Sequence, residues 1–243
     1  MPDKIKPYKN SNVNKKEQIA KMFNHISGKY DLLNRIISFG IDIKWRKKVV
    51  SIVAKCNPIN ILDIATGTGD LAINLSKTNA KKITGIDISK GMLDIGINKV
   101  KKLNLSDKIE LILCDTEDII FGNNTFDVVT VAFGIRNFDD LYKGLKEILR
   151  VLKSGGTFVI LETSLPTKTP YKQIYSLYLN KILPFIGSIF SEDGNAYSYL
   201  SKSANVFPYG IKLNRVLEKV GFINVRNYPQ FFGVASIYVA NKK

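Results

Sequence analysis

Five short apolar runs, separated by amphipathic stretches, constrain the fold of this 243-residue chain more than any other feature. The runs cover residues 59–64, 82–88, 109–114, 126–132 and 156–162. Apolar strands that alternate with helices are typical of a parallel sheet whose two faces are covered by crossover helices. The clearest helical stripe comprises Leu141, Leu145, Ile148, Leu149 and Leu152. The pattern predicts a doubly wound α/β sheet.

The end of the chain departs from this alternation. Residues 222–227 and 231–241 both have the pattern of strands, and only Tyr228, Pro229 and Gln230 separate them. Three residues cannot form a crossover helix, so the two strands must pair as an antiparallel hairpin. A parallel sheet that ends in such a hairpin is typical of the Rossmann-like class I methyltransferases, whereas nicotinamide-binding domains continue with parallel strands. We therefore expect the class I methyltransferase fold.

Two segments lie outside this core. An N-terminal arm, residues 1–57, carries one apolar helical face, and an insertion, residues 165–208, contains eight aromatic residues. The core itself covers residues 58–164, and a last helix and the hairpin cover residues 209–243. No internal repeat and no linker rich in proline, glycine or serine divides the chain. We expect a single domain over residues 1–243.

Composition and charge exclude several classes of protein. The longest apolar stretch, residues 174–190, is interrupted by polar residues and a proline, and the start of the chain is rich in lysine. We expect no membrane span and no signal peptide. Two cysteines, Cys56 and Cys114, cannot form a disulfide framework or a structural zinc site. These features predict a cytoplasmic chain with reduced cysteines and without a metal.

The net charge of +15 is also consistent with a nucleic acid or an anionic membrane as partner. However, 30 of the 36 basic residues are lysine, and the chain also contains 31 isoleucines and 21 asparagines. AT-rich coding produces the same composition. Charge alone therefore does not indicate a binding surface.

A glycine turn, Gly67-Thr68-Gly69, follows the first expected strand, which carries Asp63 near its end. Glycine lets the backbone pass close to a ligand, and the helix that follows presents unpaired N–H groups. Together with Ala72, the turn also matches the dinucleotide-binding fingerprint. The glycines alone therefore do not decide between a nicotinamide cofactor and S-adenosylmethionine.

The charges around the turn favour S-adenosylmethionine. Residues 58–76 contain Asp63 and Asp70 but no lysine or arginine, so a pyrophosphate would be repelled, whereas a sulfonium and an ammonium suit carboxylates. Asp87 ends the second strand, where it can accept both hydroxyls of a ribose. Asp115 follows the third strand and is placed to meet the edge of the adenine.

Three long patterns resemble those of a known family. Residues 30–45 read Tyr-Asp-Leu-Leu-Asn-Arg-Ile-Ile-Ser-Phe-Gly-Ile-Asp-Ile-Lys-Trp, residues 133–137 read Phe-Gly-Ile-Arg-Asn, and residues 150–164 read Arg-Val-Leu-Lys-Ser-Gly-Gly-Thr-Phe-Val-Ile-Leu-Glu-Thr-Ser. From residue 22 to residue 235, the chain resembles the quinone C-methyltransferases of menaquinone and ubiquinone biosynthesis. Shorter matches to the insertion of this family lie at residues 182–184, 187 and 197–200.

The resemblance implies that S-adenosylmethionine contacts Thr68, Asp87, Asp115 and Thr116. It also implies transfer of a methyl group to a ring carbon of a polyprenylated naphthoquinol or benzoquinol. The menaquinone branch is favoured, because the residues around Arg35 resemble that branch more closely. The sequence does not give the length of the prenyl chain.

Four positions depart from the family pattern. The side chains of Leu33 and Ser154 have shapes that those positions can accept. Ala132 replaces a serine that touches the cofactor in relatives. Asp42 stands where relatives usually have a histidine, so no catalytic role of that histidine carries over. The histidine of this chain, His25, aligns with no such position. We expect a structural role for Asp42, and a catalytic role is the alternative.

The implied chemistry needs a reduced ring with one hydroxyl largely ionised, because a neutral ring is a poor nucleophile. Arg136 is the candidate cation beside the ring, and Asn137 can fix the ring oxygen by a hydrogen bond. The proton can leave through water, Tyr30 or Asp42. If Arg136 is structural instead, we expect a salt bridge to a nearby acid such as Asp139.

The prenyl tail and the aromatic insertion suggest contact with lipid at the inner face of the cytoplasmic membrane, although the same rings can simply pack a lid. A homodimer is left open. RNA methylation is disfavoured, because residues 132–136 lack the motif of adenine methylation and neither cysteine has the context of cytosine methylation. A nicotinamide-binding protein without catalytic activity is a further alternative.

Overall fold

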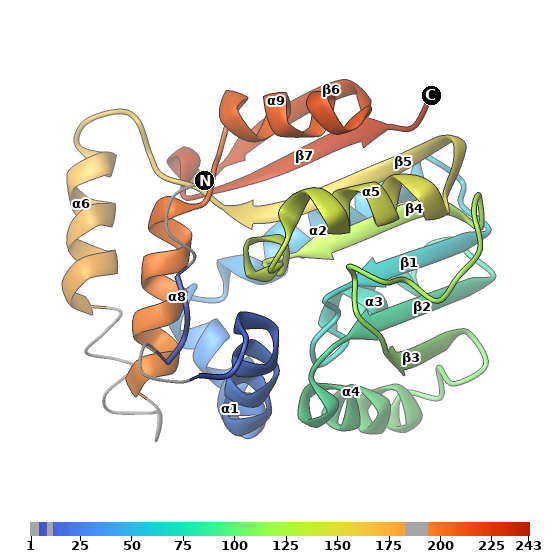
Figure 1. The fold of residues 1–243 in the computed structure, drawn as a ribbon, viewed down its shortest axis with the longest axis horizontal. Helices are drawn as coiled ribbons and strands as arrows, with labels where there is room; N and C mark the ends of the chain where they lie inside the picture. The colour runs from blue at the N-terminus through green and yellow to red at the C-terminus, as the bar shows by residue number, and fades with distance from the viewer. Residues whose placement is uncertain (1–4, 9–11, 183–193) are drawn as a thin grey trace.

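The computed structural model describes residues 5–8, 12–182 and 194–243, and within them a seven-stranded sheet forms the centre of the molecule (Figure 1). The strand order is β3-β2-β1-β4-β5-β7-β6. The strands are β1 (Asn60–Ile64), β2 (Lys82–Asp87), β3 (Ile109–Leu113), β4 (Phe126–Ala132), β5 (Leu152–Thr163), β6 (Ile223–Gln230) and β7 (Ala235–Asn241). The first five run parallel, and β7 pairs antiparallel with β5 and β6. The doubly wound sheet and the terminal hairpin are confirmed.

The turn of the hairpin lies three residues later than the sequence predicts. Residues 228–230 belong to β6, where Pro229 pairs with Ser236. Because β6 is an edge strand, the missing N–H of Pro229 is tolerated. The chain reverses instead through the short helix η3 (Phe231–Gly233), in which Phe232 adopts a φ of 57°. The expected turn at Tyr228 to Gln230 is therefore wrong.

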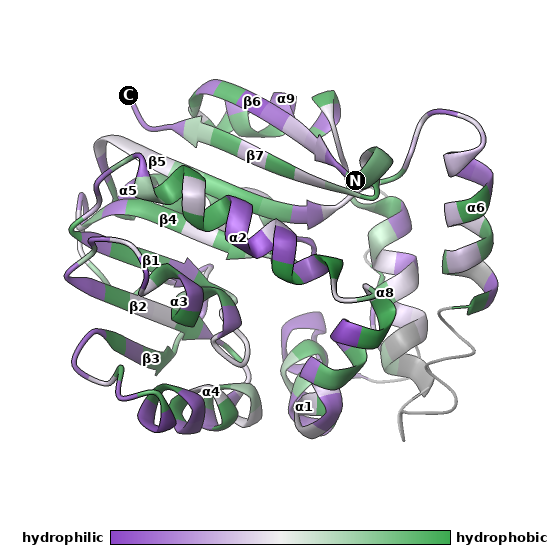
Figure 2. Ribbon diagram, turned by 180° about the vertical axis from the view of Figure 1, so that it is seen from behind, coloured by the Kyte–Doolittle hydropathy of each residue, from purple (hydrophilic) through white to green (hydrophobic). Residues whose placement is uncertain are grey.

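Helices cover both faces of the sheet. They are α2 (Ile41–Ala54), α3 (Asp70–Leu75), α4 (Lys90–Lys102), α5 (Leu141–Val151) and α9 (Ile211–Val220). In β1, Leu62 packs with α5 and α9 on one face, and Ile61 packs with α2 and α3 on the other. Burial on both faces explains why the core strands are mainly apolar, and Figure 2 shows stretches of hydrophobic colour along β4 and β5.

The N-terminal arm forms the long helix α1 (Lys15–Ile37), which begins at the cap residue Asn14. Its apolar face, with Met22 fully buried, packs on α4 and on α8 (Gly194–Val206). Figure 1 shows α1, α8 and α6 (Tyr171–Leu177) grouped beyond the carboxyl ends of the parallel strands. Open α/β sheets bind their ligands at this edge.

The aromatic insertion contributes α6, the short helix η2 (Tyr178–Ile182) and α8 to this group. Residues 183–193 of the insertion lie outside the described residues; they include Pro184 and Gly187 of the family matches and two of the eight aromatic residues, Phe185 and Phe190. Within the described parts of the chain, none of the helices is long and apolar enough to cross a membrane.

Candidate active site

The glycine turn after β1 opens onto a cavity. Gly67 adopts a φ of 57° and lines the cavity, and a Cβ atom added there would meet nothing within 4 Å. The Gly67 amide donates a hydrogen bond to Oδ2 of Asp87 at 2.8 Å. The backbone at the turn is thus both exposed to a ligand and fixed by the acid at the end of β2.

This first cavity lies at the carboxyl ends of four parallel strands. Its volume is about 670 Å³, including the open space at its mouth. Its walls include the predicted residues Asp87, Asp115, Thr116 and Asn137. The helix α1 closes it from the other side with Lys16, Ile19, Phe23 and Tyr30. Predicted residues from three distant parts of the sequence thus meet at one cavity.

Asp87 is placed to bind two hydroxyl groups. Its Oδ1 accepts a hydrogen bond from the amide of Ser89 at 2.8 Å, and its Oδ2 accepts the bond from Gly67. Burial raises the pKa of Asp87, and the backbone amides oppose this rise. Each carboxylate oxygen keeps a second lone pair for a ligand.

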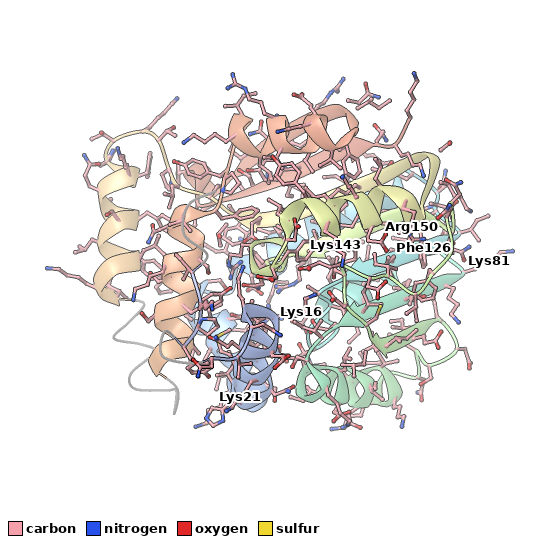
Figure 3. The ribbon with its side chains drawn as sticks, viewed as in Figure 1. Lys16, Lys21, Lys81, Phe126, Lys143 and Arg150 are labelled. Atoms are coloured by element: carbon pink, nitrogen blue, oxygen red, sulfur yellow. The ribbon has the colours of Figure 1, made fainter. Side chains whose placement is uncertain are left out.

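Asp115 is already engaged by a residue that the sequence analysis did not single out. Lys16 on α1 places its Nζ 2.5 Å from Oδ2 of Asp115 and 3.1 Å from Oε2 of Glu117. Figure 3 shows Lys16 between α1 and the strand ends. Burial alone would lower the pKa of Lys16, but the bonds to both carboxylates raise it overall. No sequence spacing signals this pair, because 99 residues separate its members.

Three predicted cofactor residues do not line the cavity. Asp63 is 1% exposed, and its two oxygens accept hydrogen bonds from Thr66 at 2.7 Å and Thr130 at 2.6 Å. Burial raises its pKa to about 6, and the hydroxyls oppose the rise. The hydroxyl of Thr68 donates a hydrogen bond to Asp31 on α1, and Gly69 is the N-cap residue of α3. Asp63 therefore stabilises the glycine turn through its hydrogen bond with Thr66 and does not line the cavity.

A second cavity, of about 860 Å³, lies beside the first. Tyr30 and Phe133 line both cavities and form their common wall. The other lining residues are largely apolar or aromatic and come from α1, α2 and the insertion: Ile37, Trp45, Tyr175, Tyr178, Leu179 and Leu200. Arg46 and Arg136 are the cationic residues of its lining.

Arg136 lies in the wall of this second cavity and is paired with Glu162. Its Nη1 donates to Oε1 of Glu162 at 2.6 Å and to the carbonyl of Phe133 at 2.8 Å. Burial would lower the pKa of Arg136, but the carboxylate of Glu162 raises it overall. The expected salt bridge from Arg136 to Asp139 is wrong. The pairing of β4 with β5 brings Glu162 to Arg136 instead.

Asn137, next to Arg136 in sequence, belongs to the first cavity and not to the second. It lines the first cavity, and its Oδ1 accepts a hydrogen bond from the hydroxyl of Tyr199 at 3.1 Å. The neighbouring residues Arg136 and Asn137 thus serve different cavities, although the sequence analysis placed both beside the same ring.

Asp42 is buried in the wall of the second cavity and accepts hydrogen bonds from two arginines. Its Oδ2 accepts hydrogen bonds from Arg35 and Arg46, and its Oδ1 accepts one from Ser38 at 2.7 Å. Arg46 also lies over the ring of Phe133, 5.5 Å from its centroid. Arg46 was not among the predicted site residues, although its place four positions after Asp42 on one helical face is a sequence signal for this ion pair.

The described residues contain no group of three or more histidine, cysteine or acidic side chains that is able to hold a metal ion.

Comparison with known proteins now identifies the family. The family model described as the ubiE/COQ5 methyltransferase family matches residues 11–242. The chain belongs to the ubiE/COQ5 methyltransferase family. A protein of Bacteroides fragilis named demethylmenaquinone methyltransferase is 44% identical over 241 residues, which are 99% of this chain and 98% of that protein.

Other members of the ubiE/COQ5 family are nearly as similar. A demethylmenaquinone methyltransferase of Thermotoga maritima is 43% identical over 93% of this chain and 96% of its own length. A Geobacter sulfurreducens protein named ubiquinone/menaquinone biosynthesis C-methyltransferase UbiE is 42% identical over 94% of this chain and 90% of its own.

Solved structures show the fold of the ubiE/COQ5 chain. A methyltransferase from Methanococcus maripaludis, described as putative and dependent on S-adenosyl-L-methionine, superposes with a TM-score of 0.60 over 97% of this chain and 98% of its own, at 19% identity. A methyltransferase from Thermotoga maritima superposes with a TM-score of 0.62 over 93% of this chain and all of its own, at 17% identity. The predicted class I methyltransferase fold is confirmed.

Proposed function

We propose that this methyltransferase transfers a methyl group from S-adenosylmethionine to a ring carbon of a polyprenylated demethylmenaquinol. The observation that carries the proposal is the pair of cavities that meet at Tyr30 and Phe133. One cavity is rich in carboxylates, and the other is aromatic with two arginines. The names of the relatives from Bacteroides fragilis and Thermotoga maritima support the choice of substrate.

The first cavity fits the proposed methyl donor. S-adenosylmethionine carries its methyl group on a positively charged sulfur, which the acidic lining suits. Asp87 offers two acceptors to the ribose, and the open space at Gly67 lets the backbone approach the ligand closely. Asp115 and Thr116 are left for the adenine, provided that Lys16 moves away from Asp115.

In the second cavity, Arg136 is the group that we assign to the ring oxygen. A phenolic pKa near 10 lies about 3 units above neutral pH, so the site must supply roughly 4 kcal/mol to ionise it. Burial raises the pKa of Tyr30, so this side chain stays protonated and orients the ring rather than removing its proton. Asp42 is occupied by two arginines, which leaves water as the exit for the proton.

We assign the tail of the substrate to the aromatic side of the second cavity, next to an exposed apolar rim. The rim consists of Phe39, Ile174, Leu177, Ile182, Phe231 and Phe232. Phe39 is 78% exposed and Ile174 is 62% exposed, and Phe232 stacks on Tyr171. We propose that this rim rests on the inner face of the cytoplasmic membrane, where a prenyl tail enters the cavity from the lipid.

A second substrate class has support from the relatives. The Geobacter sulfurreducens protein carries a name that includes ubiquinone biosynthesis, so a polyprenyl methoxy-benzoquinol is the alternative acceptor. The test is to incubate the purified chain with labelled S-adenosylmethionine and a short-chain quinol of each type, under reducing conditions. We expect mass spectrometry to show methylation of the naphthoquinol. Methylation of the benzoquinol alone would reverse the assignment.

A further inference from the structure

Tyr199, on helix α8 of the insertion, contacts a residue of the first cavity. Its hydroxyl donates a hydrogen bond to Oδ1 of Asn137 at 3.1 Å, across 62 residues of sequence. Tyr199 is 2% exposed and packs with Ile19 and Met22 of α1, so its hydroxyl has a fixed position. Burial raises the pKa of Tyr199 to about 12, although the charge of Arg136 opposes the rise. The hydroxyl therefore keeps its proton at neutral pH and remains a donor.

This hydrogen bond determines which way the amide of Asn137 faces. An asparagine side chain has an oxygen that accepts and a nitrogen that donates, and a half-turn about its last bond exchanges the two. With the oxygen bound to Tyr199, the nitrogen is left for a ligand. Among the described residues, none accepts a hydrogen bond from Nδ2 of Asn137, and Nδ2 is not one of the buried polar atoms that lack a partner. Because Asn137 is half-buried and lines the first cavity, a ligand can reach this nitrogen.

The segment that follows Asn137 lies against the part of the cavity that we assign to the adenine. The backbone amides of Asp139 and Asp140 donate to Oε1 of Glu117 at 2.7 and 3.0 Å. Glu117 lies two residues after Asp115, and both line the first cavity together with Asn137. Asn137 therefore offers a donor on the side of the cavity where Asp115 offers an acceptor.

We propose that Tyr199 is a positioning residue that holds the amide of Asn137 as a hydrogen-bond donor to N1 of the adenine. Adenine has an amino group that donates and, next to it, the ring nitrogen N1 that accepts. Asp115 accepts from the amino group, and Asn137 donates to N1. The inference rests on the proposed placement of S-adenosylmethionine in the first cavity.

The fixed amide makes the site selective for the base. In hypoxanthine an oxygen replaces the amino group, so the pattern is reversed: the oxygen accepts and the N1–H donates. The N–H groups of Asn137 then face the N1–H, and the hypoxanthine oxygen faces the carboxylate of Asp115. Such unpaired groups weaken binding. Tyr199 thus contributes to the selection of adenine without touching it.

The test compares two ligands that differ only in the base. S-adenosylhomocysteine and S-inosylhomocysteine, its deaminated form, are titrated into the full chain by calorimetry without a methyl acceptor. We expect the wild-type chain to bind S-adenosylhomocysteine at least about tenfold more tightly. In Tyr199→Phe, the amide of Asn137 can turn its oxygen toward the N1–H of hypoxanthine, so this preference should fall about three- to tenfold. Asp115 still accepts from the amino group and keeps the rest of the preference.

Two further variants show whether the effect of Tyr199 passes through Asn137. In an Asn137→Ala background, adding Tyr199→Phe should not change the preference again, because no amide is left to turn. In Asn137→Asp, the side chain keeps an acceptor for Tyr199 but has no donor for N1, so the preference should also fall about three- to tenfold. A merely structural role of Tyr199 would lower the melting temperature of Tyr199→Phe and leave its preference at the wild-type value.

The matched control is Tyr238→Phe. Tyr238 is 1% exposed, and its hydroxyl accepts a hydrogen bond from the amide of Gly210 at 2.7 Å, but it does not line the first cavity. We expect this variant to keep the wild-type preference. If the wild-type chain binds both ligands equally, or if Tyr199→Phe keeps the wild-type preference, the inference is wrong. Should Tyr199→Phe not fold, Asn137→Asp decides, and an unchanged preference in that variant refutes the inference.

The outcome is separable from that of the proposed function. A chain that methylates the quinol in the mass-spectrometric assay, but whose preference does not respond to Tyr199→Phe, keeps the function and loses the inference. A chain that binds neither ligand and methylates no quinol loses the function itself.

Discussion

Oδ2 of Asp87 accepts a hydrogen bond from the amide of Gly67 at 2.8 Å, 20 residues earlier in the chain. The carboxylate thus fixes the glycine turn while it faces the first cavity. We expect Asp87→Ala to weaken S-adenosylmethionine binding at least tenfold, because the ribose loses two bonds of about 1.5 to 3 kcal/mol each. Calorimetry on the folded variant measures this loss, and unchanged affinity would falsify the assignment. Asp94→Ala, on the exposed side of α4, is the control.

Asp42 should contribute to stability more than to turnover. Asp42→Asn leaves the buried Arg46 without its carboxylate, and breaking a buried pair costs about 3 to 5 kcal/mol. Urea unfolding measures this change. In the exposed pair of Lys90 with Asp94, Asp94→Asn should cost less than about 1 kcal/mol. Normal stability with a hundredfold slower turnover would show that Asp42 is catalytic.

Arg136 should act on turnover and not on the affinity for the methyl donor. Arg136→Ala should lose two to three orders of magnitude in kcat, on the order of 3 to 4 kcal/mol, while Arg136→Lys retains part of the activity. Single-turnover methylation of a short-chain demethylmenaquinol measures both. Because Glu162 then lacks its partner, the double variant Arg136→Ala/Glu162→Ala separates lost stability from lost turnover. A rate above about a third of wild type in Arg136→Ala would contradict electrostatic activation.

The buried carboxyl of Asp63 should make stability depend on pH. Burial raises its folded pKa from 3.8 to about 6, so the folded state holds its proton more tightly than the unfolded state does. Stability from this group is therefore greatest below about pH 4 and falls by on the order of 3 kcal/mol as the pH rises past 6. Asp63→Asn should lack this fall. Urea unfolding at several pH values measures the free energy of unfolding of both chains. If this free energy changes with pH in the same way in wild type and in Asp63→Asn, the ionisation of Asp63 does not cause the pH dependence.

The apolar rim should bind the chain to anionic vesicles. Flotation with phosphatidylglycerol liposomes should recover the wild-type chain, and salt should weaken the association because lysines contribute to it. Phe39→Ser combined with Ile174→Ser should reduce recovery several-fold. Ile59→Ser is the matched control, because Ile59 is 50% exposed but precedes β1 at the opposite edge of the sheet. If the wild type, the double variant and Ile59→Ser are recovered equally, the rim does not bind the membrane and only covers the cavity.

The strands of the core were predictable because each one is a short, mainly apolar run. Burial on both faces of a parallel sheet imposes that pattern, so Phe126–Ala132 is predicted with its observed bounds. The turn of the hairpin was not predictable in the same way. Pro229 resembles a turn residue in sequence, and only its place on an edge strand makes it acceptable within β6.

The residues of the candidate site divide along similar lines. Asp87 is the last residue of β2 and Asp115 lies two residues after β3, so their place at the carboxyl edge follows from the sheet. In contrast, Glu162 meets Arg136 only because β5 lies beside β4, and Lys16 meets Asp115 only because α1 folds over the strand ends. Such pairs depend on tertiary packing, which local sequence patterns do not encode.

The helix α1 supplies Lys16, Ile19 and Phe23 to one cavity and Asn34 and Ile37 to the other, with Tyr30 common to both. A ligand that settles in either cavity therefore fixes one wall of its neighbour. Thermodynamic linkage then requires the two ligands to change each other's affinity by the same factor. An inhibitor that occupies only the quinol side would alter the retention of the methyl donor, and its apparent potency would depend on the ratio of methylated to demethylated donor in the cell.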